Sequence, residues 1–460
     1  MRLTILGGGG FRVPLVYGAL LRDRAEGRVT HVTLHDLDRA RLTAIARVLA
    51  DQADGFPDAP AVTVTTDLDD ALRGADFVFS AIRVGGLEGR AADERVALAE
   101  GVLGQETVGA GGIAYGLRTV PVAVDIARRV ARLAPEAWVI NFTNPAGLVT
   151  EAMSRHLGDR VIGICDSPVG LGRRVAGVLG IADPAAARLD YVGLNHLGWL
   201  RGVYADDEPG RGNLLPALFE DESALASFEE GRLFGAEWLR SLGSVPNEYL
   251  HYYYFNRETV TAYREAKQTR GAFLRDQQAR FYADMADRTP GSPPSGALAA
   301  WDRTRAEREA TYMTENREAA GAGERAADDL ESGGYEYVAL VLMRAIARDE
   351  RATLILNVRN RGTLSLLDEA AVIEVPCLVE ATGARPVAVS PLTGHEAGLV
   401  AAVKAVERCV LEAAESGSAR AAVKAFALHP LVDSVGVARK LLDGYRSVHP
   451  GLDYLKSGVR

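Results

Sequence analysis

The feature that most constrains the fold is a regular alternation of short apolar segments and amphipathic helical stretches over residues 3–164. Strands that alternate with helices in this way form a parallel sheet covered on both faces. We therefore expect residues 1–170 to form a Rossmann-type α/β domain. The predicted strands are residues 3–6, 29–35, 62–64, 77–81, 138–142 and 161–164, and the predicted helices are 13–24, 39–52 and 120–133.

The pattern changes after residue 170, where long helical stretches dominate. They cover residues 224–239, 262–287 and 335–348, and two β-rich runs lie at 353–358 and 372–379. Residues 289–296 (TPGSPPSG) predict a turn, because proline and glycine interrupt regular structure. We expect residues 171–460 to form a second, mainly helical α+β domain, as in the lactate and malate dehydrogenases.

Charge and cysteine content exclude several classes of protein. The net charge of −9 argues against a general nucleic-acid binder, because phosphate backbones require a basic face. The apolar N-terminal segment is too short for a signal peptide, and no apolar stretch reaches the length of a membrane span. Three cysteines, an odd number, make a disulfide framework improbable in so long a chain. We expect a cytoplasmic protein with no membrane partner.

A glycine-rich loop joins the first predicted strand to the first predicted helix. Glycines here let the backbone approach a diphosphate, and the helix N-terminus offers unpaired N–H groups. Asp36, at the end of the second strand, can bind ribose hydroxyls and favours NAD over its phosphorylated form. The pattern departs from the usual fingerprint, because Arg12 stands where the third glycine is expected and Asp36 comes about 30 residues on rather than ~20. The predicted cofactor-binding residues are Gly7, Gly8, Gly9, Gly10 and Asp36.

Three later motifs follow predicted strands or open the second region. They are residues 141–145 (NFTNP), 163–168 (GICDSP) and 193–196 (GLNH). Side chains at the carboxyl ends of strands in an open α/β sheet converge on one crevice. We therefore expect these three motifs to meet around a single ligand site.

Together with residues 104–107 (GQET) and 249–254 (YLHYYY), these motifs resemble glycoside hydrolase family 4, which contains the NAD- and manganese-dependent 6-phospho-glucosidases. The resemblance extends from Gly7 to Cys377. It implies a reaction in which NAD oxidises carbon 3 of the sugar, a base removes the carbon 2 proton, the aglycone is eliminated, and water then adds. This family is an exception to glycosidase chemistry with two carboxylates.

The resemblance also implies a metal site. Cys165 and His196 match the family's two protein ligands, and the cation, Mn²⁺ or another divalent metal, stabilises charge that develops on the carbon 2 and carbon 3 oxygens. A thiolate and an imidazole would suit zinc as well, so manganese comes from the resemblance alone. Cys165 taken singly would be interpreted as a buried structural thiol.

Tyr249 matches the family's catalytic base, and Glu106 matches the residue that raises the basicity of this tyrosine. Asp166 matches an aspartate that protonates the leaving oxygen in the phospho-α-glucosidases. Arg90, Asn144 and Arg270 match substrate-contacting positions. Arginine suits a sugar phosphate, because its guanidinium donates two parallel hydrogen bonds.

The preferred anomer is open in the sequence. The family contains phospho-α-glucosidases and phospho-β-glucosidases, and residues 166–168 (DSP) match the motif of neither group fully. Residues 112–116 and 195–199 favour the α-glucosidases, whereas residues 141–147 (NFTNPAG) favour the β-glucosidases. We predict a 6-phospho-β-glucosidase that acts on a small phosphorylated glycoside and forms a homodimer or homotetramer. The alternatives are a 6-phospho-α-glucosidase, a plain NAD-dependent hydroxy-acid dehydrogenase, and a non-catalytic sugar-phosphate sensor.

Overall fold

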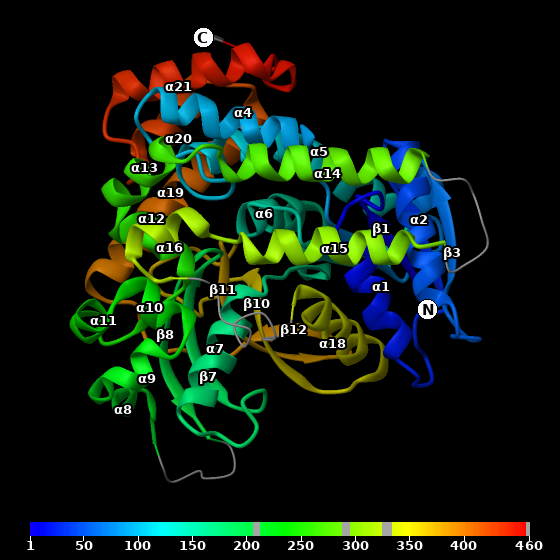
Figure 1. The fold of residues 1–460 in the computed structure, drawn as a ribbon, viewed down its shortest axis with the longest axis horizontal. Helices are drawn as coiled ribbons and strands as arrows, with labels where there is room; N and C mark the ends of the chain where they lie inside the picture. Colours follow the sequence, from blue (N-terminus) through cyan, green and yellow to red (C-terminus); the bar gives the residue numbers. More distant parts are fainter. Residues whose placement is uncertain (206–211, 288–294, 324–333, 457–460) are drawn as a thin grey trace.

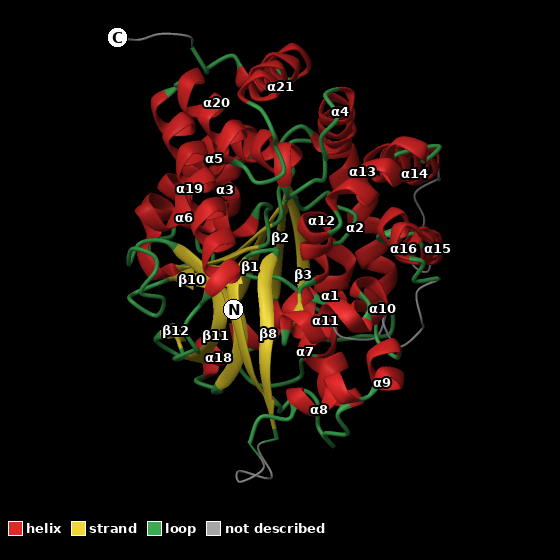
Figure 2. Ribbon diagram, turned by 90° about the vertical axis from the view of Figure 1, so that its left-hand side faces the viewer, coloured by secondary structure: helices red, strands yellow, loops and turns green. Residues whose placement is uncertain are grey.

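One mixed sheet of twelve strands forms the centre of the protein in the computed structural model, which describes residues 1–205, 212–287, 295–323 and 334–456. Helices lie on both sides of the sheet (Figure 2). Most of the turn predicted at 289–296 lies outside the described residues. Within the described ranges, no helix combines the length and the apolar character needed to cross a membrane.

The first six strands form the parallel half of the sheet. Their order is β3-β2-β1-β4-β5-β6, and each neighbouring pair is parallel. This is the strand order of dinucleotide-binding domains. The prediction of a Rossmann-type sheet is therefore confirmed. The strands are β1 (Arg2–Leu6), β2 (His31–His35), β3 (Ala61–Thr65), β4 (Phe77–Ser80), β5 (Trp138–Asn141) and β6 (Val161–Gly163).

The three predicted helices of this half are present as α1, α2 and the C-terminal part of α5, which begins at Gly109 instead of at 120. The sequence did not predict α3, α4, α6 and α7. The first turns of α5 contain several glycines, and this is why the sequence did not predict a helix there. A Cβ on Gly111 would lie 2.2 Å from the carbonyl oxygen of Gln105, so the glycine allows close packing inside a helix. The helices are α1 (Val13–Arg22), α2 (Arg39–Ala53), α3 (Leu68–Leu72), α4 (Gly86–Ala99), α5 (Gly109–Leu133), α6 (Ala146–Leu157) and α7 (Ser167–Val178), with the 3-10 turn η1 (Gly158–Arg160).

The second region continues the same sheet with antiparallel strands. β10 pairs with β6, and β11 connects β10 to β7, β8 and β9, while β12 pairs with β11. The two predicted β-rich runs are confirmed as β10 and β11. The strands are β7 (Arg188–Leu194), β8 (Leu197–Tyr204), β9 (Val245–Pro246), β10 (Ala352–Arg359), β11 (Val372–Glu380) and β12 (Gly383–Pro386).

Two of the three long helices predicted in this region are wrong. Residues 224–239 form α9, α10 and α11, which are separated near residue 228 and at Gly235 with its φ of 76°. Residues 262–287 fall into α13 and α14, with 266–269 outside both helices. The prediction of 335–348 is confirmed as α18. The helices between residues 212 and 323 are α8 (Leu215–Glu220), α9 (Glu222–Ala226), α10 (Glu229–Phe234), α11 (Ala236–Leu242), η2 (Glu248–Leu250), α12 (His251–Tyr254), α13 (Asn256–Glu265), α14 (Arg270–Asp287), α15 (Ala297–Ala310) and α16 (Thr314–Ala320).

The chain after residue 333 adds α18 (Tyr335–Arg348), α19 (Gly394–Ser416), α20 (Ala419–Leu428), α21 (Val435–Val448) and η3 (Pro450–Leu452). The last three α-helices pack beside α4 and α5 (Figure 1).

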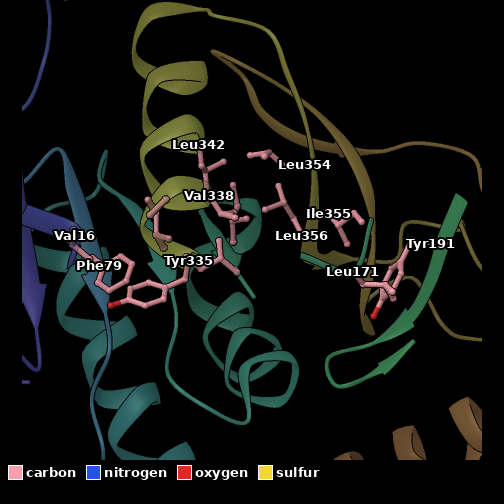
Figure 3. Close-up of a cluster of buried hydrophobic side chains, with 14 of the residues drawn as sticks. Val16, Phe79, Leu171, Tyr191, Tyr335, Val338, Leu342, Leu354, Ile355 and Leu356 are labelled. Atoms are coloured by element: carbon pink, nitrogen blue, oxygen red, sulfur yellow. The ribbon is translucent and has the colours of Figure 1, made fainter. Parts of the chain in front are cut away.

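Helix α18 joins the two halves of the sheet. Its buried side chains, among them Val338 and Leu342, lie over β10 and reach toward Phe79 of β4 (Figure 3). Tyr335, at the start of the helix, stacks on Phe142 with ring centroids 4.1 Å apart. Because Phe142 follows β5, this packing sets the first residues of α18 at the carboxyl end of the parallel strands.

Candidate active site

One cavity of about 990 Å³ extends from the glycine loop to the C-terminal half of α15. Of the thirteen residues predicted for the site, all but Gly8 and Gly9 line it. The lining residues from that set are Gly7, Gly10, Asp36, Arg90, Glu106, Asn144, Cys165, Asp166, His196, Tyr249 and Arg270.

The glycine loop has the tight geometry of a diphosphate cradle. Gly7 has a φ of 80°, and a Cβ there would lie 2.5 Å from the carbonyl oxygen of Ala81. A Cβ on Gly8 would lie 2.8 Å from the backbone nitrogen of His35. The N–H of Gly9 donates a hydrogen bond to the Asp36 carboxylate at 3.1 Å. This backbone and its acidic neighbour fit the diphosphate and ribose of NAD.

Cys165 lies directly beyond β6 and is buried. Burial, followed by the charges of Glu374 and Asp166, raises the pKa of the Cys165 thiol well above its usual range. A thiol in these surroundings becomes a thiolate only when a cation balances its charge. The donor chemistry therefore fits a metal ligand.

His196 lies in the turn between β7 and β8, with a φ of 62°. Burial lowers the pKa of its imidazole to about 3, so the ring is neutral and can bind a metal. Its Nδ1 atom lies 2.7 Å from the Thr107 hydroxyl. The residues that the structure describes contain no group of three or more His, Cys, Asp or Glu suited to a metal. A cation held by Cys165 and His196 would thus keep coordination positions open for substrate oxygens.

Tyr249 lies flat against His196. The two ring centroids are 3.6 Å apart and the planes differ by 7°. The hydroxyl groups of Tyr249 and Tyr312 are hydrogen-bonded at 3.1 Å. Burial, followed by Tyr312 and Glu248, raises the pKa of the Tyr249 phenol well above its usual range. The predicted base is therefore beside a predicted metal ligand, where a cation would favour loss of its proton.

Glu106 lies in the same cavity, where it forms ion pairs with Arg83 and Arg90. Burial opposes ionisation of Glu106, but these two charges outweigh it and hold the pKa of the carboxyl below its usual range. Among the described residues, no hydrogen bond joins Glu106 to Tyr249. Its effect on the basicity of Tyr249 stays a prediction.

The predicted substrate-binding arginines are bound to protein groups. Arg90 pairs with Glu94 at 3.1 Å as well as with Glu106. Arg270 donates to the Thr311 hydroxyl at 2.5 Å and to the Arg308 carbonyl at 2.7 Å. Arg308 itself lines the cavity, and the sequence did not single it out.

Asn144 and Asp166 present free polar groups. Asn144 precedes a cis peptide bond to Pro145, and Asp166 precedes α7 without capping it through its side chain. In residues 1–205, 212–287, 295–323 and 334–456, neither side chain makes a hydrogen bond. Both are therefore available to a ligand in the cavity.

Glu248 is a further site residue that the sequence did not indicate. It lines the cavity, and its carboxyl accepts a hydrogen bond from Ser167 at 2.6 Å. Burial, followed by the charge of Glu230, raises its pKa to about 8. Ser167 and Glu248 are 81 positions apart in the sequence, so only the folded chain reveals this pair.

Replacing Glu248 by glutamine is expected to stabilise the protein at pH 8. Because the folded-state pKa exceeds the ordinary 4.5, the carboxyl lowers the free energy of unfolding as pH rises from 4.5 to 8. The gain at pH 8 should be up to about 4 kcal/mol and should vanish near pH 4.5. Urea unfolding at both pH values measures it, and an equal gain at both would contradict the raised pKa.

Comparison with known proteins gives a consistent result along the chain. The sequence model described as family 4 glycosyl hydrolase matches residues 2–181, and that of the family 4 glycosyl hydrolase C-terminal domain matches residues 191–432. A probable 6-phospho-β-glucosidase of Bacillus subtilis is 30% identical over 462 residues, which cover 98% of this chain and 96% of the relative. A 6-phospho-α-glucosidase of Lacticaseibacillus paracasei is 30% identical over 460 residues, 96% of this chain and 95% of the relative.

A solved structure is similar over its whole length. The 6-phospho-β-glucosidase of Thermotoga maritima, solved with manganese, NAD⁺ and glucose-6-phosphate, superposes with a TM-score of 0.79. The two chains are 25% identical, and the match covers 100% of each.

Proposed function

The chain belongs to family 4 of the glycosyl hydrolases, and from this premise we propose that it hydrolyses 6-phospho-β-glucosides. It is an O-glycosyl hydrolase, and NAD and a divalent cation, Mn²⁺ in the Thermotoga relative, are its cofactors. The observation that carries the proposal is the stack of Tyr249 on His196 in the cavity that also contains Cys165 and the glycine loop.

The two cofactors supply, when bound, a hydride acceptor and donor and a positive charge for developing oxyanions. The glycine loop and Asp36 hold the dinucleotide, while Cys165 and His196 hold the cation. These two ligands come from opposite sides of the predicted domain boundary. We accordingly propose that residues 1–170 bind NAD and that residues 171–460 complete the substrate and metal site.

Tyr249 removes the proton from carbon 2 of the sugar. Once the phenol is ionised, the Tyr312 hydroxyl can donate its hydrogen bond to the phenolate and stabilise it. Asp166, whose carboxyl has no protein partner among the described residues, protonates the leaving oxygen. Glu106 keeps Arg83 and Arg90 in place at the wall of the cavity.

The charge of the cavity supports a phosphorylated substrate. Arg83, Arg90, Arg270 and Arg308 all line it. Arg83 and Arg90 pair with Glu106, and Arg90 also pairs with Glu94, whereas Arg270 and Arg308 form no ion pair with a described carboxylate. Guanidinium groups that lack an ion-pair partner in a partly buried site favour binding of a phosphate dianion.

The preference for the β anomer rests on residues 141–147 and on the Bacillus relative. The second candidate is a 6-phospho-α-glucosidase, which the free carboxyl of Asp166 favours. A plain dehydrogenase would accumulate NADH, whereas the proposed cycle returns its hydride and leaves NAD unchanged after each turnover.

Hydrolysis of the α- and β-nitrophenyl glucoside 6-phosphates tests the proposal, with NAD and Mn²⁺ added separately. We expect the β substrate to be cleaved faster, and only when both cofactors are present. In deuterium oxide the product should carry deuterium at carbon 2. Faster cleavage of the α substrate would contradict the anomeric preference, and full activity without cofactors would contradict the reaction.

A further inference from the structure

Arg308 of α15 is a cation without a protein counter-ion. Its guanidinium makes no hydrogen bond and no ion pair with any residue in the described part of the chain, although it lines the cavity. Its backbone carbonyl is fixed by Arg270 at 2.7 Å. The backbone at Arg308 is therefore anchored, while its guanidinium charge has no ion-pair partner among the described residues.

Arg12 is in the same condition. Its guanidinium carbon lies 5.6 Å from the ring centroid of Phe142 and 5.2 Å from that of Tyr335, which hold it by cation–π contact. The Tyr335 hydroxyl donates to the Arg12 carbonyl at 2.7 Å. Within the described residues the guanidinium has no hydrogen bond and no ion pair. Burial opposes its charge, but Tyr335 and Asp166 outweigh burial and raise the pKa of Arg12, in contrast to Arg308.

Arg12 and Arg308 line the same cavity, and neither guanidinium forms an ion pair with a described residue. Burial lowers the pKa of Arg308 well below its usual range, and the largest electrostatic contribution to this shift comes from Arg12, ahead of Arg270. Burying two positive charges near each other costs free energy unless an anion binds between them. Arg83 and Arg90 differ, because Glu106 already pairs with both.

We propose that Arg12 and Arg308 form a clamp that binds the phosphate group of the sugar substrate. This inference rests on the proposed function and names the residues that recognise the phosphate. Arg308 lines the cavity together with Tyr249 and with Tyr312, whose hydroxyl donates a hydrogen bond to Tyr249. The diphosphate of NAD is the other phosphate source, since Arg12 directly precedes α1.

The test measures binding of glucose 6-phosphate and of glucose by calorimetry, with NAD and Mn²⁺ present, to the wild type and to Arg308→Met and Arg12→Met. Each substitution should weaken binding of glucose 6-phosphate about 10- to 100-fold, because each removes hydrogen bonds to a charged group. Binding of glucose and of NAD should not change. Arg308→Lys should recover part of the affinity.

Arg303→Met is the matched control, because Arg303 is an exposed residue of the same helix that does not line the cavity. Without phosphate, Arg308→Met should melt no lower than the wild type, since it removes a repulsion, but glucose 6-phosphate should no longer stabilise it.

Three outcomes would overturn the clamp. Unchanged affinity for glucose 6-phosphate in both variants, while the wild type cleaves phosphorylated glucosides, overturns the clamp alone. Weakened NAD binding by Arg12→Met, with glucose 6-phosphate unaffected, assigns Arg12 to the cofactor and overturns it as well. A wild type that does not bind glucose 6-phosphate overturns the proposed function together with the clamp.

Discussion

Replacement of Tyr249 by phenylalanine is expected to lower kcat by about 10²- to 10⁴-fold, the range that a positioned general base contributes. The ring keeps its stack on His196, so the fold and the cation site should survive. Only the phenolic oxygen that takes the carbon 2 proton is lost. The measurement is kcat with a β-nitrophenyl glucoside 6-phosphate, together with exchange of deuterium into carbon 2.

Tyr253→Phe provides the matched control, because Tyr253 belongs to the same segment but does not line the cavity. It should keep its activity and its exchange at carbon 2. A Tyr249→Phe enzyme that exchanged deuterium at the wild-type rate would show that another group removes the proton.

Replacement of Cys165 by alanine is expected to abolish tight binding of the divalent cation and to lower kcat by about 10³-fold or more. Stabilisation of developing charge by a metal contributes several kcal/mol, and about 1.4 kcal/mol corresponds to a factor of ten. Removal of the metal from the wild type with a chelator should have a similar effect. Elemental analysis of the purified protein and the rate after addition of Mn²⁺ measure both effects.

Cys409→Ala is the control for thiol chemistry, since Cys409 is a buried free cysteine of α19 outside the cavity. It should retain both metal and activity. If Cys165→Ala bound Mn²⁺ as tightly as the wild type, the thiol would not be a ligand.

Local sequence was sufficient for the six parallel strands and for β10, β11 and α18. The strand at residues 372–379 and the helix at 335–348 were predicted within one residue of β11 and α18, because each is marked by hydrophobic periodicity and by its flanking residues. Hydrophobic periodicity did not predict the ends of helices that stop at one residue with an unusual backbone conformation. Gly235, with its positive φ, ends α10, although its neighbours continue a helical pattern.

The members of the site could be named from motifs, but their partners could not. Residues 163–168 and 193–196 each follow or lie between strands, so their convergence on one crevice was expected. The ion pairs of Glu106, the bond from Ser167 to Glu248 and the hydrogen bonds of Arg270 join different elements. No local pattern encodes such contacts.

The sequence by itself determined the parallel sheet, the glycine loop and the residue types that supply a thiol, an imidazole and a phenol. Only the tertiary structure decided that the second region extends the same sheet, that Tyr249 lies on His196, and that Arg12 and Arg308 form no ion pair with the residues it describes. The physical reason is range. Helices and strands arise from interactions among near neighbours in the chain, whereas the charge and burial of a side chain depend on which distant segments pack around it.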